Sequence, residues 1–143
     1  MRVGGAKPRT VGYNGEVLHQ GPIPRFAHGA IEYLAGALFI AAPFLLSFDS
    51  DSATAVSIVV GVLVLAIAAS TEGPTSLVNQ LPLGAHVVLD YVLVALLIGS
   101  PFIFGFSGEG PPTIFFIALG VAHLMVTIGT RFEKGGSDAA RSG

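Results

Sequence analysis

The sequence predicts an all-α fold: a four-transmembrane-helix bundle made of two tandem parallel two-helix repeats. The first supporting observation is composition, because 52% of the 143 residues are hydrophobic and only 11% are charged, far from the balance of a soluble domain. The second is that the apolar residues gather in four blocks, at roughly 28–48, 53–70, 84–106 and 113–131. Each block has about 18 to 23 residues, enough for a helix rising about 1.5 Å per residue to cross about 30 Å of hydrocarbon.

The third observation is an internal repeat. Residues 28–48 (HGAIEYLAGALFIAAPFLLSF) align with residues 86–106 (HVVLDYVLVALLIGSPFIFGF) and are identical to them at 8 of 21 positions. The second span of each unit aligns more weakly, with Gly61 matching Gly120 and Thr71 matching Thr130. Because each unit has two spans, both enter the membrane in the same direction, which predicts a parallel repeat about a pseudo-two-fold axis along the membrane normal.

In chain order, the repeat divides the sequence into five parts. We expect a flexible N-terminal tail at 1–27, because this segment is rich in glycine, proline and polar residues. The first two-span repeat follows at 28–71, a linker at 72–83, the second two-span repeat at 84–132 and a C-terminal tail at 133–143. Pro43 and Pro101 are predicted to kink or end the first span of each repeat, and the carbonyl that each proline leaves free near Phe39 or Leu97 must find another donor.

The charge distribution predicts the orientation. All seven Lys and Arg residues lie in the two tails or at the ends of the spans that join them, whereas the loops at 49–52 and 107–112 carry acids and no base. The positive-inside rule therefore predicts a multi-pass protein of the inner (plasma) membrane, with both termini and the linker in the cytoplasm.

Five ionisable side chains interrupt the apolar spans. An ion at the centre of a membrane helix costs about 2.5–3.5 kcal/mol on insertion scales, so each of these residues needs a physical reason. The repeat pairs His28 with Glu32 and His86 with Asp90, each four residues apart and so on one helix face. His123 is expected at a comparable depth on the fourth span. We expect all five to converge in a cluster near the cytoplasmic side.

Several roles fit such a cluster. One is a structural polar network that fixes helix register, with Tyr33, Tyr91 and Thr127 as further partners. A second is a metal site, because imidazoles and carboxylates are ligands for Zn²⁺ or a di-metal centre. A third is haem held by two histidines, and a fourth is a proton-responsive site. The pattern identifies no catalytic residue, so we expect no enzymatic activity and no obligatory cofactor.

The ends of the two first spans resemble a known signature. Ser100-Pro101-Phe102 and Ala42-Pro43-Phe44 are similar to the small-Pro-aromatic motif of the SPW-repeat membrane proteins, and the resemblance covers residues 28–131. The sequence departs from that family in having no Trp, so that Phe stands in its place. The resemblance implies the two-hairpin architecture and supplies no activity.

The function expected from these observations is that of a non-enzymatic structural, accessory or stress-related membrane component. The alternative is a small proton- or metal-coupled transporter or sensor that uses the His and carboxylate cluster. The expected partner is the lipid bilayer, with a second copy of the chain or another membrane protein contacting small-residue faces such as Gly36 and Ala37. No basic and aromatic stripe suggests nucleic acid.

Overall fold

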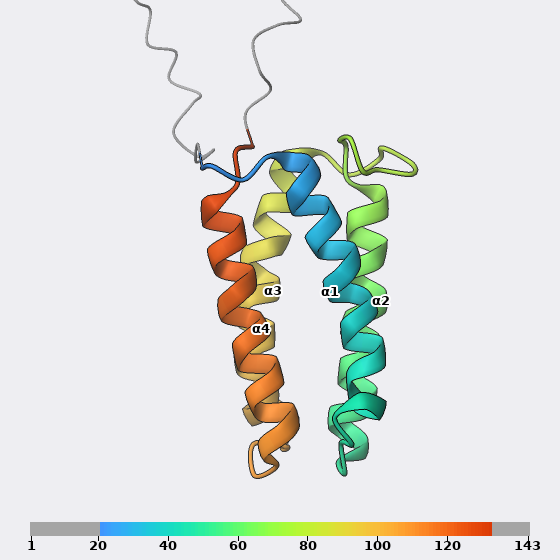
Figure 1. The fold of residues 1–143 in the computed structure, drawn as a ribbon, viewed down its shortest axis with the longest axis vertical. Helices are drawn as coiled ribbons and strands as arrows, with labels where there is room; N and C mark the ends of the chain where they lie inside the picture. The colour runs from blue at the N-terminus through green and yellow to red at the C-terminus, as the bar shows by residue number, and fades with distance from the viewer. Residues whose placement is uncertain (1–20, 133–143) are drawn as a thin grey trace, which may run out of the picture.

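The computed structural model describes residues 21–132, and the predicted tails lie largely outside this range. Four helices account for most of it: α1 (Arg25–Leu45), α2 (Asp51–Ser70), α3 (Leu83–Ile103) and α4 (Gly110–Gly129). They run alternately up and down in one bundle, and the two ends of the described chain meet at the same end of it (Figure 1). All four helices are long and apolar enough to span a membrane. The predicted fold class is confirmed.

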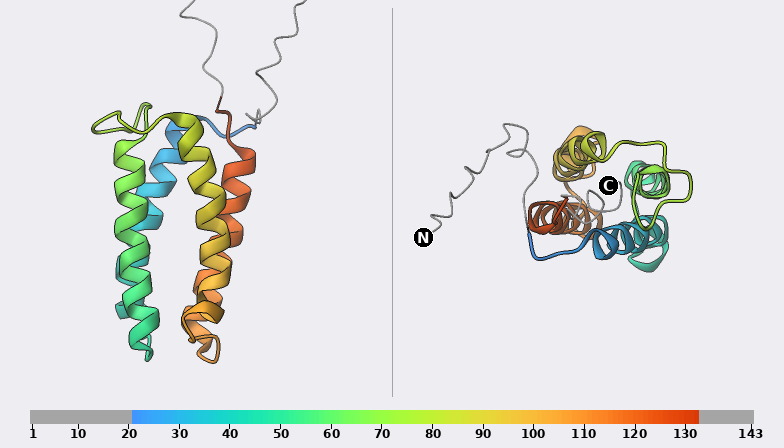
Figure 2. Two further views of the ribbon diagram at one scale, coloured as in Figure 1. Left: turned by 180° about the vertical axis from the view of Figure 1, so that it is seen from behind. Right: turned by 90° about the horizontal axis from the view of Figure 1, so that it is seen from above.

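The bundle consists of two helical hairpins that correspond to the two repeats. Helix α1 packs along α2, and α3 packs along α4, whereas the hairpins meet more sparsely through α1 with α4 and α2 with α3 (Figure 2). Within the first hairpin the backbones approach closely at Gly36 and Gly61, where a Cβ on Gly61 would lie 2.6 Å from the Gly36 carbonyl oxygen. Gly36 is therefore buried against α2 inside the chain, whereas Ala37 is exposed.

The first helix of each repeat ends earlier than the apolar pattern indicates, at Leu45 and Ile103. Both ends are closed by the same hydrogen-bonded turn. After α1, the Phe48 N–H donates to the Pro43 carbonyl at 3.0 Å while Ser47 has a left-handed φ of 52°. After α3 the equivalent bond to Pro101 is 2.9 Å and the left-handed residue is Gly105, with φ 75°. Each proline thus lies in the last helical turn and accepts the bond that ends the helix.

The carbonyl that Pro43 leaves free has found a partner on the neighbouring helix. The hydroxyl of Ser57 on α2 donates to the Phe39 carbonyl oxygen at 2.5 Å, and both groups are buried. In hydrocarbon an unpaired carbonyl costs several kcal/mol, so this bond compensates the proline and ties α1 to α2.

The half of the bundle nearer the short loops has an aromatic core. Phe39 packs edge-on against Phe115 and Phe116, with ring centroids 4.9 and 5.4 Å away, and Phe106 lies 5.2 Å from Phe116. At the tips of the hairpins, the Glu109 carboxylate accepts hydrogen bonds from the backbone N–H of two residues of the 46–50 turn, at 2.6 and 3.0 Å. These contacts fix the two hairpins against each other at this end.

A short cover closes the opposite end. The segment before α1 pairs with the segment after α4 through the bonds from Ile23 N–H to Gly129 O and from Arg131 N–H to Ile23 O, both 2.9 Å. The 71–82 loop folds back on itself and lies across the ends of α1 and α2 (Figure 1). The polar cluster lies directly beneath this cover.

Candidate metal centre

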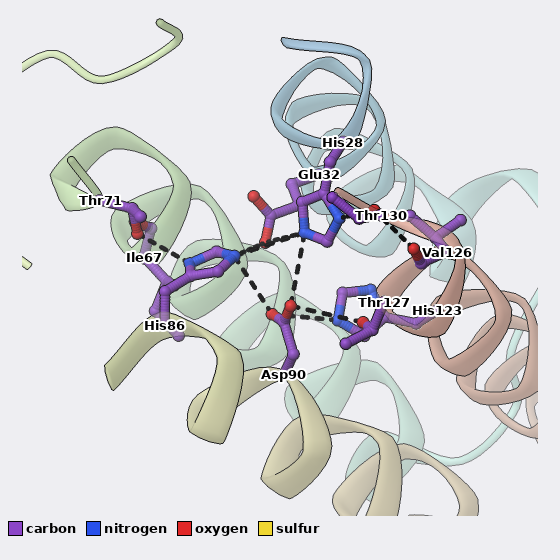
Figure 3. Close-up of polar contacts among 10 residues, drawn as sticks. All are labelled: His28, Glu32, Ile67, Thr71, His86, Asp90, His123, Val126, Thr127 and Thr130. Atoms are coloured by element: carbon purple, nitrogen blue, oxygen red, sulfur yellow. Dashed lines mark hydrogen bonds and ion pairs between the residues drawn. The ribbon is translucent and has the colours of Figure 1, made fainter. Parts of the chain in front are cut away.

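The structure brings all five ionisable residues of the spans together (Figure 3). His28 and Glu32 come from α1, His86 and Asp90 from α3, and His123 from α4. Each is at most 8% exposed. The pairs meet because α1 and α3 are the equivalent helices of the two repeats, so the pseudo-two-fold axis passes between them.

Four of these residues direct one ligand atom each at a common point. The Nε2 atoms of His28 and His86 lie 3.4 Å apart. His28 Nε2 is 3.6 Å from a Glu32 oxygen and 3.4 Å from an Asp90 oxygen. His86 Nε2 is 3.3 and 3.4 Å from oxygens of the same two carboxylates. One donor atom from each of the four residues lies within 4.8 Å of all the others.

Two threonines hold the imidazoles from behind. Thr130 Oγ1 lies 2.8 Å from His28 Nδ1, and Thr71 Oγ1 lies 2.8 Å from His86 Nδ1. Each hydroxyl donates its own proton to its helix, at 2.6 Å to the Val126 carbonyl and 2.7 Å to that of Ile67. The threonine oxygens can therefore only accept from the imidazoles, which places a proton on both Nδ1 atoms. In the neutral imidazole, Nε2 then directs its lone pair into the cluster.

These supporting bonds cross between the repeats. Thr71 belongs to the first repeat and supports a histidine of the second, while Thr130 belongs to the second and supports His28 of the first. The sequence analysis aligned the two threonines with each other but gave them no role in the cluster. The repeat contained a signal for this role. Two aligned threonines at the same depth as two aligned histidines can each form a hydrogen bond to one of the imidazoles.

The cluster is symmetric except around Asp90. His123 Nε2 lies 3.4 Å from an Asp90 oxygen, and the Thr127 hydroxyl donates to the other at 3.4 Å. By the repeat alignment, the corresponding positions on α2 are Val64 and Ala68, which offer no polar atom to Glu32. His123 Nε2 is buried without a hydrogen-bond partner among the described residues. His123 thus faces the rim of the cluster and is not one of the four converging ligands.

The two tyrosines expected in the network lie outside it. The hydroxyl of Tyr33 donates to the Thr75 carbonyl at 3.0 Å, in the loop between α2 and α3, and Tyr91 is 47% exposed on the outer face of α3. Each follows its carboxylate by one residue, which turns it by about 100° around the helix. This correction removes both from the candidate site.

The space around the cluster limits the size of a ligand. A cavity of about 20 Å³ lies beside His28, Glu32 and His86, and an apolar cavity of about 60 Å³ borders His123. Neither cavity could hold a porphyrin. The haem interpretation does not fit this site, whereas a single ion does.

Comparison with known proteins agrees with the architecture. A family model described as the SPW repeat domain matches residues 26–130, which include nearly all of the four helices. No curated protein and no solved structure shows a significant match.

Proposed function

Since the chain belongs to the SPW repeat family, a family of membrane proteins, we propose that it is a non-enzymatic multi-pass protein that binds one divalent transition-metal ion. The ligands are His28, Glu32, His86 and Asp90, and Zn²⁺ is the ion whose preferences they match. The coarser conclusion, a small membrane protein, rests on the four apolar helices and the family match. The bound metal ion is the part of the proposal that goes beyond this conclusion.

The observation that carries the proposal is the spacing of the ligand atoms. In a tetrahedral zinc site with bonds of about 2.0–2.1 Å, neighbouring ligand atoms are separated by about 3.3–3.4 Å. The imidazole nitrogens are 3.4 Å from each other and 3.3–3.6 Å from the carboxylate oxygens. The two imidazoles approach different oxygens of Asp90 and the four donor atoms lie within 4.8 Å of one another, so an ion at the centre requires the carboxylates to turn one oxygen each toward it.

Charge and hydrogen bonding support the same conclusion. Two neutral imidazoles and two carboxylates carry a charge of −2, which a divalent cation neutralises in a site buried among apolar helices. Metal-binding histidines commonly donate their other ring N–H to an acceptor that fixes the tautomer, and Thr71 and Thr130 provide such acceptors at 2.8 Å. The supporting shell is thus matched to metal binding.

The number of ligands supports a non-enzymatic role. Catalytic zinc sites keep one coordination position for water or substrate, whereas structural and regulatory sites use four protein ligands. Four side chains converge here, so a tetrahedral ion would be fully enclosed.

The second candidate is a structural or accessory role, including a stress-related one, in which the cluster is only an internal network. It is favoured by the fact that protons can replace the metal ion: two protonated imidazoles would also neutralise the two carboxylates. In that case each Nε2 donates to the carboxylates around it. The two candidates differ in whether the site takes up metal.

Metal analysis of the purified protein tests the proposal. The purified protein is first freed of metal with a chelator and then titrated with Co²⁺ in detergent. It should bind one ion and develop the intense visible absorption of tetrahedral cobalt. His86→Gln should abolish this band, and His123→Gln should retain it because that histidine is not one of the four ligands. Absence of binding by the unmodified chain would favour the structural network, and equal loss in both variants would refute the proposed ligand set.

We further propose that the protein lies in the inner (plasma) membrane with both termini in the cytoplasm and lipid as its main partner. The support is that Arg25 and Arg131 lie at one end of the bundle, whereas Asp49, Asp51 and Glu109 lie at the other. Labelling of single cysteines in intact cells, which is straightforward because the chain has none of its own, tests the orientation.

A further inference from the structure

We propose that a metal ion reaches the cluster only from the membrane face that bears Arg25 and Arg131, so that the protein senses or stores metal from one compartment and does not carry it across. This inference rests on the metal site proposed above. It chooses between the sensor and transporter alternatives on the basis of what lies on either side of the cluster.

On the side of the chain ends, a short route leads to the ligands. The cavity of about 20 Å³ is lined by His28, Glu32 and His86 at its base and by residues 71–75 of the α2–α3 loop at its mouth. A cavity of about 10–15 Å³ or more can hold a water molecule when polar groups line it. The ligand atoms are thus separated from this face by a polar space and a single loop.

The loop is fastened over the cavity by side chains of α1. The guanidinium of Arg25 donates to the Glu72 carbonyl at 2.7 Å, and the hydroxyl of Tyr33 donates to that of Thr75 at 3.0 Å. Gly29 allows the contact, because a Cβ there would lie 2.1 Å from Thr75 Oγ1. Arg25 also lines the cavity, so its positive charge opposes a cation entering while the loop is closed.

In the other direction, the described helices offer an ion no free buried ligand between His123 and the tips of the hairpins. Beyond His123 comes the apolar cavity of about 60 Å³, and then the packed rings of Phe39, Phe115 and Phe116. Within residues 21–132, the fully buried polar side chains of this half are Ser57 and Ser100, and both already donate to backbone carbonyls. An apolar cavity of this kind stays dry, so an ion leaving this way would lose its ligands without replacement.

One-sided access is tested in sealed vesicles of phosphatidylethanolamine and phosphatidylglycerol. An impermeant maleimide on parallel samples of Gln80→Cys and Ser107→Cys, two exposed positions at opposite ends of the bundle, gives the fraction of chains in each orientation. Zn²⁺ added outside should bind only the fraction of chains whose Gln80 face is outward, and an impermeant zinc dye inside should stay silent. A zinc ionophore should then fill the remaining sites.

Three results would overturn the inference: binding that follows the Ser107 fraction, complete filling without ionophore, or a protein-dependent signal from the internal dye. A fourth result separates the two proposals. If the sites stay empty after the ionophore and in detergent, the metal site itself is refuted, and one-sided access with it.

The loop is tested by the rate of binding in detergent. Arg25→Gln should speed Zn²⁺ association roughly tenfold, which corresponds to about 1.4 kcal/mol, while the equilibrium affinity stays within a few-fold. Tyr33→Phe, which frees the loop without changing charge, should act in the same direction. Arg131→Gln is the matched control, because Arg131 lies at the same end, binds the Gly21 carbonyl and does not line the cavity. Equal rates in all four proteins would overturn the assignment of the loop as the gate.

Discussion

Replacing either supporting threonine by valine should weaken metal binding without removing a ligand. Val has nearly the shape of Thr, so Thr130→Val keeps the packing and deletes the oxygen that accepts from His28 Nδ1 at 2.8 Å. The imidazole then has a buried N–H without a partner, and nothing fixes which nitrogen faces the ion. The hydroxyl's bond to its own helix carbonyl contributes little to stability and is not the source of the effect.

The magnitude follows from what such supporting bonds contribute elsewhere. Loss of one typically lowers metal affinity about 10- to 100-fold, which corresponds to about 1.4–2.7 kcal/mol. Since Thr71 supports His86 over the same 2.8 Å, Thr71→Val and Thr130→Val should show losses of similar size. The pseudo-symmetry thus predicts a matched pair of effects from opposite corners of the bundle.

Competition against a chromophoric zinc chelator in detergent measures these affinities. Thr113→Val is the control, because the Thr113 hydroxyl donates to the Phe106 carbonyl at 3.0 Å near the other end of the bundle. The zinc affinity of this variant should equal that of the unmodified chain. If both site variants bind zinc as tightly as the control while His86→Gln does not bind, the inference that the threonines orient the imidazoles is incorrect.

Two further predictions concern the fold and are measured by thermal unfolding in detergent. Ser47→Gly should stabilise the protein by about 0.5–1 kcal/mol, because Ser47 has a left-handed φ of 52° that glycine adopts without a steric penalty. Gly105→Ala should destabilise the protein for the same reason. An unchanged stability of Ser47→Gly would contradict this interpretation of the helix end. Ser57→Ala should destabilise by about 1–3 kcal/mol, because it leaves the carbonyl freed by the α1 proline without its 2.5 Å partner; an unchanged midpoint would show that this carbonyl needs no donor.

The architecture was predictable because it follows from lengths and repetition. Four apolar blocks of spanning length leave few alternatives to four helices, and two copies of one pattern imply two equivalent hairpins. The ends of α1 and α3 were not predicted, since both apolar runs continue beyond the last helical turn. Gly105 carried part of that signal, whereas Ser47 is a residue whose left-handed conformation depends on its surroundings.

The candidate site was predictable in its members but not in its connections. Spacing of four residues placed each histidine on the same face as its carboxylate, and the repeat brought the two pairs to one depth. The roles of Thr71 and Thr130 depend on which helix of one hairpin faces which helix of the other, and residue spacing within a repeat does not encode that. Tyr33 was misassigned for the related reason that adjacent residues diverge around a helix.

The exchange of threonines between the hairpins has a consequence for assembly. Each hairpin is held together by contacts between neighbours in sequence, while the complete coordination shell exists only after the two hairpins have docked, because neither contains both a histidine and its supporting hydroxyl. An ion bound there would therefore stabilise the docked form of the two hairpins. Metal supply would then determine how firmly the two hairpins stay together at the end of the bundle away from the aromatic core.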